Sequence, residues 1–115
     1  MDHILAMEHL VNSSEEFIRA LNNKIVIFYF SSESCAVCRS FLPQFKSLLE
    51  SQFPEIDFYQ IHSELNTALC ADNMVFTFPT ILIFVNGKET LRFSRIIPLS
   101  NVRDALDRLR ILLSD

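Results

Sequence analysis

The feature that most constrains the fold is the uninterrupted apolar run at residues 25–30, Ile-Val-Ile-Phe-Tyr-Phe. Every residue in this run is β-branched or aromatic, and the run has the length of a strand. A run without polar alternation is typical of a strand that is covered on both faces. The sequence therefore predicts a central strand with further layers of structure on each side of it.

Segments with helical and strand patterns alternate around this run. Residues 13–16, Ser-Ser-Glu-Glu, form a capping box ahead of a predicted helix of about ten residues, and a second helical pattern extends to about Ser51. A strand is predicted at residues 56–61 and a short helix at residues 65–70. No repeat, low-complexity tract or linker separates these segments, so residues 1–115 are expected to form one domain.

A β-hairpin is predicted near the end of the chain. Asn86-Gly87, which contains the single glycine, separates strand-like residues 80–85 from residues 88–93. A two-residue type I′ turn needs positive φ at both positions, and Asn-Gly supplies it. Ser100 is expected to cap a last helix with one apolar stripe, formed by Val102, Leu106, Leu109 and Leu113. The whole pattern predicts an α/β sandwich with helices on a mixed sheet.

Composition and charge narrow the range of functions. With 115 residues, half of them hydrophobic, the chain can bury a sizeable core without a disulfide framework. A net charge of −4 argues against nucleic acid as a partner. Residues 1–9 carry charge where a signal peptide needs an apolar stretch, and no apolar run approaches the length of a membrane span. A cytoplasmic protein that does not enter the membrane is therefore expected.

Cys35-Ala36-Val37-Cys38 is a C-x-x-C motif placed after the predicted central strand and at the start of a predicted helix. The spacing alone is a weak signal, but the context strengthens it. Unpaired backbone N–H groups and the macrodipole at a helix start stabilise an anion and lower the pKa of the first cysteine. Cys35 is therefore expected to be the attacking thiolate. Cys38, one turn into the helix, is expected to be the resolving thiol that closes the disulfide.

These motifs, in this order, resemble the thioredoxin family over nearly the whole chain. The matching elements, besides the strand at residues 25–30 and the cysteine pair, are Pro43, Phe78-Pro79-Thr80 and residues 84–88. Residues 7–10 resemble the family's first strand. The resemblance implies the thioredoxin fold, a three-layer α/β sandwich with a mixed sheet of about five strands flanked by about four helices. It also implies a cis peptide bond between Phe78 and Pro79.

The resemblance further implies thiol–disulfide exchange with protein substrates, a role in cell redox homeostasis, and no bound cofactor or metal. Phe78 and Pro79 are expected to hold the substrate chain as an added strand. Phe76 lies two residues before Phe78 and is expected to join it at the rim of the site, with ordinary packing as the alternative. A monomer that is recycled by a thioredoxin-reductase-type enzyme is expected.

Several positions depart from the common thioredoxin pattern. Ser34 replaces the tryptophan before the first cysteine, and Ala36-Val37 replaces Gly-Pro. Tyr29 stands where many thioredoxins bury an aspartate that shuttles a proton, and a phenol is a poor base at neutral pH. Residues 94–97 replace a glycine near the docking groove with a bulkier, charged stretch, which is expected to alter the choice of partner.

The cysteines also allow other interpretations. Cys35 and Cys38 could be retained without redox use, or could hold zinc, for which Cys70 and His62 are the only candidates to complete four ligands. Cys70 is more simply explained as a small core residue beside Leu69. The alternative function is a redox-silent or weakly active thioredoxin-fold module that binds a protein partner in the same groove.

Overall fold

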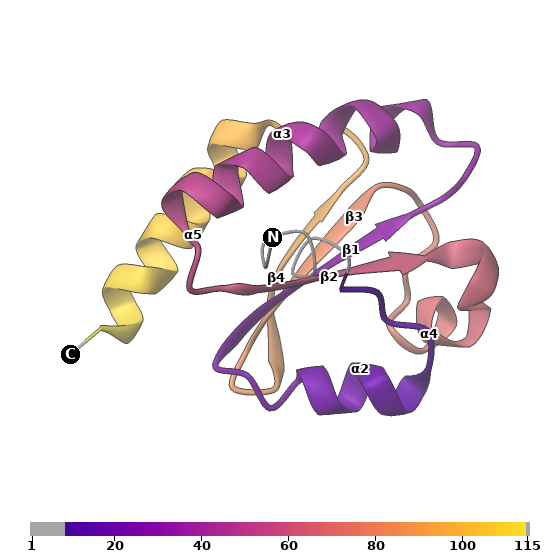
Figure 1. Ribbon diagram of the computed structural model, residues 1–115, viewed down its shortest axis with the longest axis horizontal. Helices are drawn as coiled ribbons and strands as arrows, with labels where there is room; N and C mark the ends of the chain where they lie inside the picture. Colours follow the sequence, from indigo (N-terminus) through magenta and orange to yellow (C-terminus); the bar gives the residue numbers. More distant parts are fainter. Residues whose placement is uncertain (1–8, 115) are drawn as a thin grey trace.

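The structure is a computed structural model that describes residues 9–114 and arranges them in three layers (Figure 1). The middle layer is a four-stranded mixed sheet formed by β1 (Ile25–Ser31), β2 (Asp57–His62), β3 (Thr80–Val85) and β4 (Lys88–Ser94). The strands lie in the order β2-β1-β3-β4. β1 runs parallel to β2 and antiparallel to β3, and β4 runs antiparallel to β3. The predicted central strand is therefore confirmed, and β3 and β4 form the predicted hairpin.

Helices cover both faces of the sheet (Figure 1). They are α2 (Ser14–Ala20), α3 (Ala36–Gln52), α4 (Thr67–Asp72) and α5 (Leu99–Leu113), and a 3₁₀ turn, η1 (Ser63–Leu65), precedes α4. Helices α3 and α5 lie on one face of the sheet, and α2 and α4 lie on the other. This arrangement confirms the predicted α/β sandwich.

The sheet is smaller than expected by one strand in the described residues. Next to β2, where a fifth strand is expected at residues 7–10, Leu10 forms only an isolated parallel bridge with Gln60. The Gln60 N–H donates to the carbonyl of His9 at 3.0 Å, and the Val11 N–H donates to the carbonyl of Gln60 at 3.0 Å. Residues 7 and 8 lie outside the described part of the chain. The described sheet therefore has four strands instead of about five.

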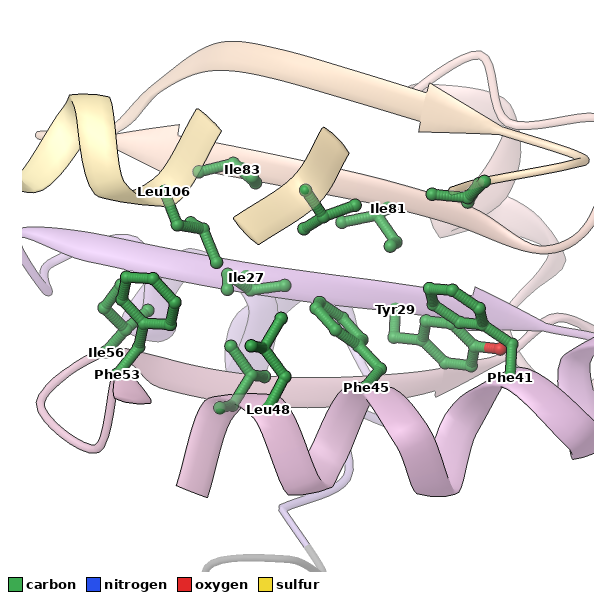
Figure 2. Close-up of a cluster of buried hydrophobic side chains, with 13 residues drawn as sticks. Ile27, Tyr29, Phe41, Phe45, Leu48, Phe53, Ile56, Ile81, Ile83 and Leu106 are labelled. Atoms are coloured by element: carbon green, nitrogen blue, oxygen red, sulfur yellow. The ribbon is translucent and has the colours of Figure 1, made fainter. Parts of the chain in front are cut away.

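Strand β1 contributes side chains to two separate cores, because successive residues of a strand point to opposite faces of its sheet. Ile27 and Tyr29 pack with residues of α3 and α5, as Figure 2 shows. Val26, Phe28 and Phe30 pack with residues of α2 and α4. All five side chains are fully buried. The prediction of a strand covered on both faces is thus confirmed.

Two local sequence signals produce the structures that they predict. The Ser13 hydroxyl accepts a hydrogen bond from the Glu16 N–H at 3.1 Å and so caps α2, which has seven residues instead of about ten. Asn86 and Gly87 have φ values of 50° and 83°, as a type I′ turn requires. Both signals act within four residues, so they need no tertiary contact.

The prediction that Ser100 caps the last helix is wrong. Helix α5 begins two residues earlier than this cap predicts, at Leu99, and Pro98 is its N-cap residue. The proline side chain has no oxygen that could accept a hydrogen bond, so the helix begins without a side-chain cap. The apolar stripe is confirmed for Val102 and Leu106, which are fully buried.

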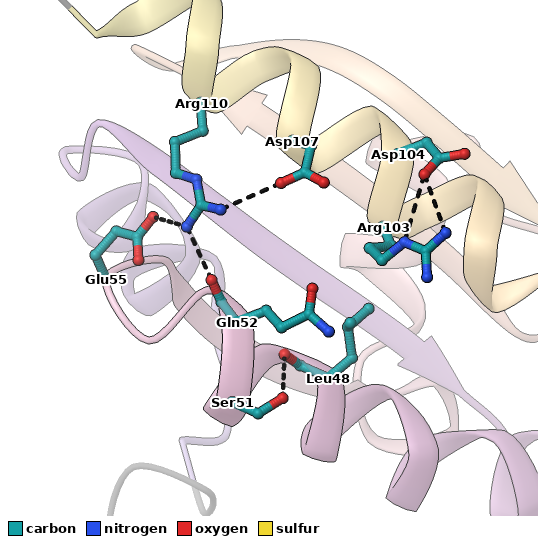
Figure 3. A network of polar contacts seen from close by, with 8 residues as sticks. All are labelled: Leu48, Ser51, Gln52, Glu55, Arg103, Asp104, Asp107 and Arg110. Atoms are coloured by element: carbon teal, nitrogen blue, oxygen red, sulfur yellow. Dashed lines mark hydrogen bonds and ion pairs between the residues drawn. The ribbon is translucent and has the colours of Figure 1, made fainter.

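Polar contacts fix the C-terminal end of α5 against the C-terminal end of α3 (Figure 3). Arg110 donates from Nη1 to the carbonyl of Gln52 at 2.8 Å, and Nη1 also lies 3.3 Å from a carboxylate oxygen of Glu55. Its Nη2 lies 3.2 Å from Asp107, and its guanidinium lies 4.5 Å from the centre of the Phe53 ring. These contacts join the two helices at the end of α3 that lies opposite the cysteine motif.

Candidate active site

The C-x-x-C motif lies where the chain leaves the central strand and enters α3. Residues 32–34 connect β1 to Cys35, which is the N-cap residue of α3. Its Sγ accepts a hydrogen bond from the backbone N–H of Cys38 at 3.1 Å. This sulfur therefore lies where unpaired N–H groups and the helix macrodipole stabilise negative charge. The prediction that the motif starts a helix is confirmed.

The two cysteines form a disulfide, but their environments differ. The Cα atoms of Cys35 and Cys38 are 5.3 Å apart, within the range that disulfides adopt. Cys35 is partly exposed, whereas Cys38 retains only 3% of its accessible surface. A protein substrate can therefore reach the sulfur of Cys35, while the sulfur of Cys38 is covered.

The loop before Cys35 is held from two sides. The Glu64 carboxylate, in η1, accepts hydrogen bonds from the Ser32 hydroxyl and from the Glu33 N–H, both at 2.8 Å. These hydrogen bonds hold the pKa of the Glu64 carboxyl below its usual range, and the bond from the Glu33 backbone has the largest effect. From the other side, Arg39 donates to the carbonyl of Glu33 at 2.6 Å. Sequence analysis did not identify this arrangement, because Glu64 and Ser32 are 32 positions apart and no local pattern links them.

Tyr29 lies beneath the cysteine motif and contacts it directly. Its buried hydroxyl donates a hydrogen bond to the carbonyl of Cys38 at 3.0 Å. Burial raises the pKa of Tyr29 to about 12. At neutral pH the phenol therefore keeps its proton and cannot act as a base. The other buried polar residues in the described part of the chain, Gln60, Asn66 and Thr80, carry no carboxylate.

Removing this hydroxyl tests its role. We expect Tyr29→Phe to lower the free energy of unfolding at pH 7 by about 1 kcal/mol, because the buried hydrogen bond to the carbonyl of Cys38 is lost. Since the folded state holds the phenolic proton more tightly than the unfolded state, the stabilisation is complete below pH 10 and is lost between pH 10 and about 12. Denaturant titrations of both proteins across this pH range measure the difference. A difference that stays constant from pH 7 to 12 would contradict the assignment.

The segment before β3 lies at the same end of the sheet as the cysteine motif. The peptide bond between Phe78 and Pro79 is cis. Thr80 on β3 pairs with Phe30 on β1. Pro79, the residue before Thr80, therefore lies beside the end of β1 from which the chain proceeds to Cys35. The carbonyl of Pro79 accepts the N–H of Arg95 at 2.8 Å. The fold thus brings Pro79 and the C-x-x-C motif together from sequence positions more than 40 residues apart.

Phe76 and Phe78 are not equivalent, although the rule of alternation predicts that they face the same way. Phe76 is 71% exposed, whereas Phe78 is partly buried against the core formed with α2 and α4. The rule fails because residues 77–79 form a bend and not an extended strand. Contact of either ring with a substrate stays a prediction.

An arginine holds the start of this segment in place. Arg92, on β4, donates to the carbonyls of Asn73 and Met74 at 2.7 and 3.0 Å. Its guanidinium is oriented by two hydrogen bonds to the Glu89 carboxylate, at 2.8 and 2.9 Å. Met74 has a positive φ of 55°, which a non-glycine residue adopts only where its surroundings hold it. Arg92 therefore fixes the turn from which the segment carrying Phe76 begins.

The remaining cysteine belongs to the core, as predicted. Cys70, on α4, is buried, and burial raises the pKa of its thiol, with a further contribution from the charge of Glu64. Across residues 9–114, no group of three or more His, Cys, Asp and Glu side chains is placed to hold a metal ion. None of the helices in this part of the chain is long and apolar enough to span a membrane.

A C-x-x-C disulfide at a helix start on an α/β sandwich is the arrangement typical of proteins that exchange thiols and disulfides. The family model for thioredoxin matches residues 8–108, and the chain belongs to the thioredoxin family. "Thioredoxin-like protein YdfQ" of Bacillus subtilis is 33% identical over 101 residues, which cover 88% of each chain. Thioredoxin-1 of Saccharomyces cerevisiae is 31% identical over 81 residues, which cover 70% of this chain and 78% of the yeast protein.

Solved structures confirm the thioredoxin fold. The thioredoxin of Malassezia sympodialis superposes with a TM-score of 0.80 at 18% sequence identity, covering 88% of this chain and 89% of the fungal one. The thioredoxin of Fasciola hepatica superposes with a TM-score of 0.78 at 22% identity, covering 87% of this chain and 97% of the other. The expected three-layer architecture is thus shared with proteins of low sequence identity.

Proposed function

We propose that this protein exchanges disulfides with protein substrates, with Cys35 as the nucleophile and Cys38 as the resolving thiol. The observation that carries the proposal is the difference between the two sulfurs. Cys35 is partly exposed at the start of α3 and accepts an N–H donor, whereas Cys38 is buried one turn below it. Only an exposed, stabilised thiolate can attack a disulfide in another protein, and only a neighbouring thiol can then release the product quickly.

The reaction consists of two exchanges. The Cys35 thiolate attacks one sulfur of the substrate disulfide, the substrate S–S bond breaks, and the departing thiolate takes a proton from solvent. The Cys38 thiol then loses its proton to solvent and its thiolate attacks the Sγ of Cys35, which breaks the mixed disulfide with the substrate and leaves the disulfide seen in the structure. The second substrate thiolate is released and takes a proton from solvent. The substrate gains two electrons from the cysteine pair and takes its two protons from solvent, into which Cys38 has released one. A dithiol reductant restores the pair by the same steps in reverse.

Phe78 and Pro79 are the residues that we propose to position the substrate chain, together with Phe76. The position of Pro79 at the end of β1 supports this role, because an extended substrate chain lying there would pass beside Cys35. The 71% exposure of Phe76 leaves an aromatic surface available to a partner. In this arrangement the substrate is held by backbone contacts and by one exposed ring.

The Cys38→Ser variant tests the order of the two cysteines. Incubated with insulin, whose chains are joined by disulfides, it is expected to accumulate a covalent complex through Cys35, because no resolving thiol remains. The complex should appear on non-reducing gels and disappear on addition of dithiothreitol. The double variant Cys35→Ser/Cys38→Ser, which keeps Cys70, is the control and should form none. Equal trapping by both variants would assign the reaction to Cys70.

A second candidate function is a redox-silent or weakly active binding module, which the Tyr29 contact favours. A phenol that keeps its proton cannot take the proton of Cys38, so the resolving step lacks a buried base. The two functions differ in their response to Cys35→Ser. If the protein is a binding module, the wild type does not accelerate disulfide reduction and the Cys35→Ser variant still binds the partner. If it is an oxidoreductase, the wild type accelerates reduction and the variant does not.

We further propose a cellular setting for the exchange reaction. A dithiol pair works catalytically where a reducing enzyme keeps it supplied with electrons, as in the cytoplasm. The protein would act there as a single-domain monomer, recycled by a thioredoxin-reductase-type enzyme and contributing to cell redox homeostasis. The acidic net charge of −4 supports protein partners over nucleic acid.

A further inference from the structure

The turn between β4 and α5 contains a charged residue in an unfavourable backbone conformation. Arg95 has a φ of 67°, in the left-handed region that glycine adopts freely and that long side chains rarely adopt. Such conformations persist only where the surroundings hold them, and they concentrate at functional positions. A glycine at this position would make the same turn without the strain. The geometry of the turn therefore does not explain why an arginine occupies this position.

The hydrogen bond that holds this conformation is made to a residue of the candidate site. The Arg95 N–H donates to the carbonyl of Pro79 at 2.8 Å, directly after the last pairing of β3 with β4, between Thr80 and Ser94. The backbone of Arg95 is thus hydrogen-bonded to Pro79, which lies beside the end of β1 where the chain turns toward Cys35. The backbone of Arg95 therefore lies beside the place proposed for the substrate chain.

The guanidinium of Arg95 is available to a partner. Arg92, Arg103 and Arg110 each form an ion pair with a carboxylate of this chain. Within residues 9–114, Arg95 has no side-chain hydrogen bond or ion pair and is exposed. The following residue, Ile96, is 87% exposed. The surface next to Pro79 therefore presents a positive charge followed by an apolar side chain.

We propose that Arg95 is a specificity-determining residue that selects protein disulfides flanked by acidic side chains. Its guanidinium pairs with an Asp or Glu carboxylate of the substrate segment that lies against Pro79, within a few residues of the disulfide cysteine. This proposal rests on the exchange function proposed above. Because the pair is exposed to solvent, we expect it to favour an acidic substrate by about two- to fivefold in kcat/KM, and added salt to weaken the preference.

The test uses two disulfide-linked peptides that are identical except for Glu or Lys beside the cysteine. Their reduction is followed with dithiothreitol as the electron source, in low salt and in about 0.5 M NaCl. We expect the wild type to prefer the Glu peptide in low salt, Arg95→Glu to prefer the Lys peptide, and Arg95→Lys to retain part of the original preference. Arg95→Gly removes the charge at no conformational cost and should show no preference.

Arg108→Glu is the matched control, because it makes the same change in net charge at an exposed position on α5. It should keep the preference of the wild type. Equal kcat/KM values of the wild type for both peptides, or the same shift in Arg108→Glu as in Arg95→Glu, would overturn the proposal for Arg95 and leave the exchange function intact. No acceleration of either peptide over dithiothreitol alone would overturn both.

Discussion

Cys35→Ser is expected to reduce insulin disulfides no faster than the reductant alone, a loss of more than about 10²-fold in the catalysed rate. A serine hydroxyl is almost fully protonated at neutral pH, so it cannot replace the thiolate that the start of α3 stabilises. Cys38 does not substitute for it, because its sulfur is buried. The rate is measured with dithiothreitol as the electron source and compared with that of the wild type.

Cys70→Ala is the control for this experiment. Cys70 is buried in the core formed with α2 and α4 and takes no part in the proposed reaction, so the variant should keep the rate of the wild type. A small apolar side chain also suits its position in the core. If Cys35→Ser kept the full rate, the nucleophile would have to be another group, and the proposed mechanism would be wrong.

Phe45→Ala is expected to lower the free energy of unfolding by about 3–5 kcal/mol, the range typical of a buried phenylalanine replaced by alanine. The Phe45 side chain is fully buried on the inner face of α3 (Figure 2). Its ring lies 5.5 Å from that of Phe41, 5.6 Å from that of Phe58 and 6.1 Å from that of Tyr29. A domain of this size is stable by only about 5–15 kcal/mol, so this single change removes a large part of its stability. Denaturant titration measures the loss.

Phe76→Ala removes the same atoms from an exposed position and serves as the matched control. Because Phe76 is 71% exposed, its removal should change the free energy of unfolding by no more than about 0.5 kcal/mol. A loss comparable to that of Phe45→Ala would show that Phe76 packs in the folded protein, and would remove it from the proposed substrate surface. The two variants thus separate the core role of phenylalanine from its surface role.

The parts of the fold that sequence analysis predicted correctly depend on short-range physics. The Ser13 cap, the Asn86-Gly87 turn and the helix start at Cys35 each involve groups within four residues of one another. The apolar run at residues 25–30 predicted a strand covered on both faces, because only burial on both sides makes such a run favourable. These features follow from local hydrogen bonds and from the hydrophobic pattern.

The parts of the site that were missed, or that differ, depend on what the neighbouring elements supply. Phe76 and Phe78 separate because the chain bends between them, and no local pattern predicts that bend. Glu64 reaches the loop at Ser32 only because β2 lies beside β1. Arg92 reaches Met74 only because β4 lies at the edge of the sheet next to β3.

By itself the sequence determined the class of fold and the position of the cysteine pair at a helix start, because helix caps, turn geometry and apolar runs act over a few residues. It also predicted the order in which the two thiols react. The tertiary structure alone decided that Tyr29 donates to the carbonyl of Cys38 and that Arg95 is attached to Pro79. The distance between such groups depends on strand pairing and helix packing, which join residues that are remote in the chain.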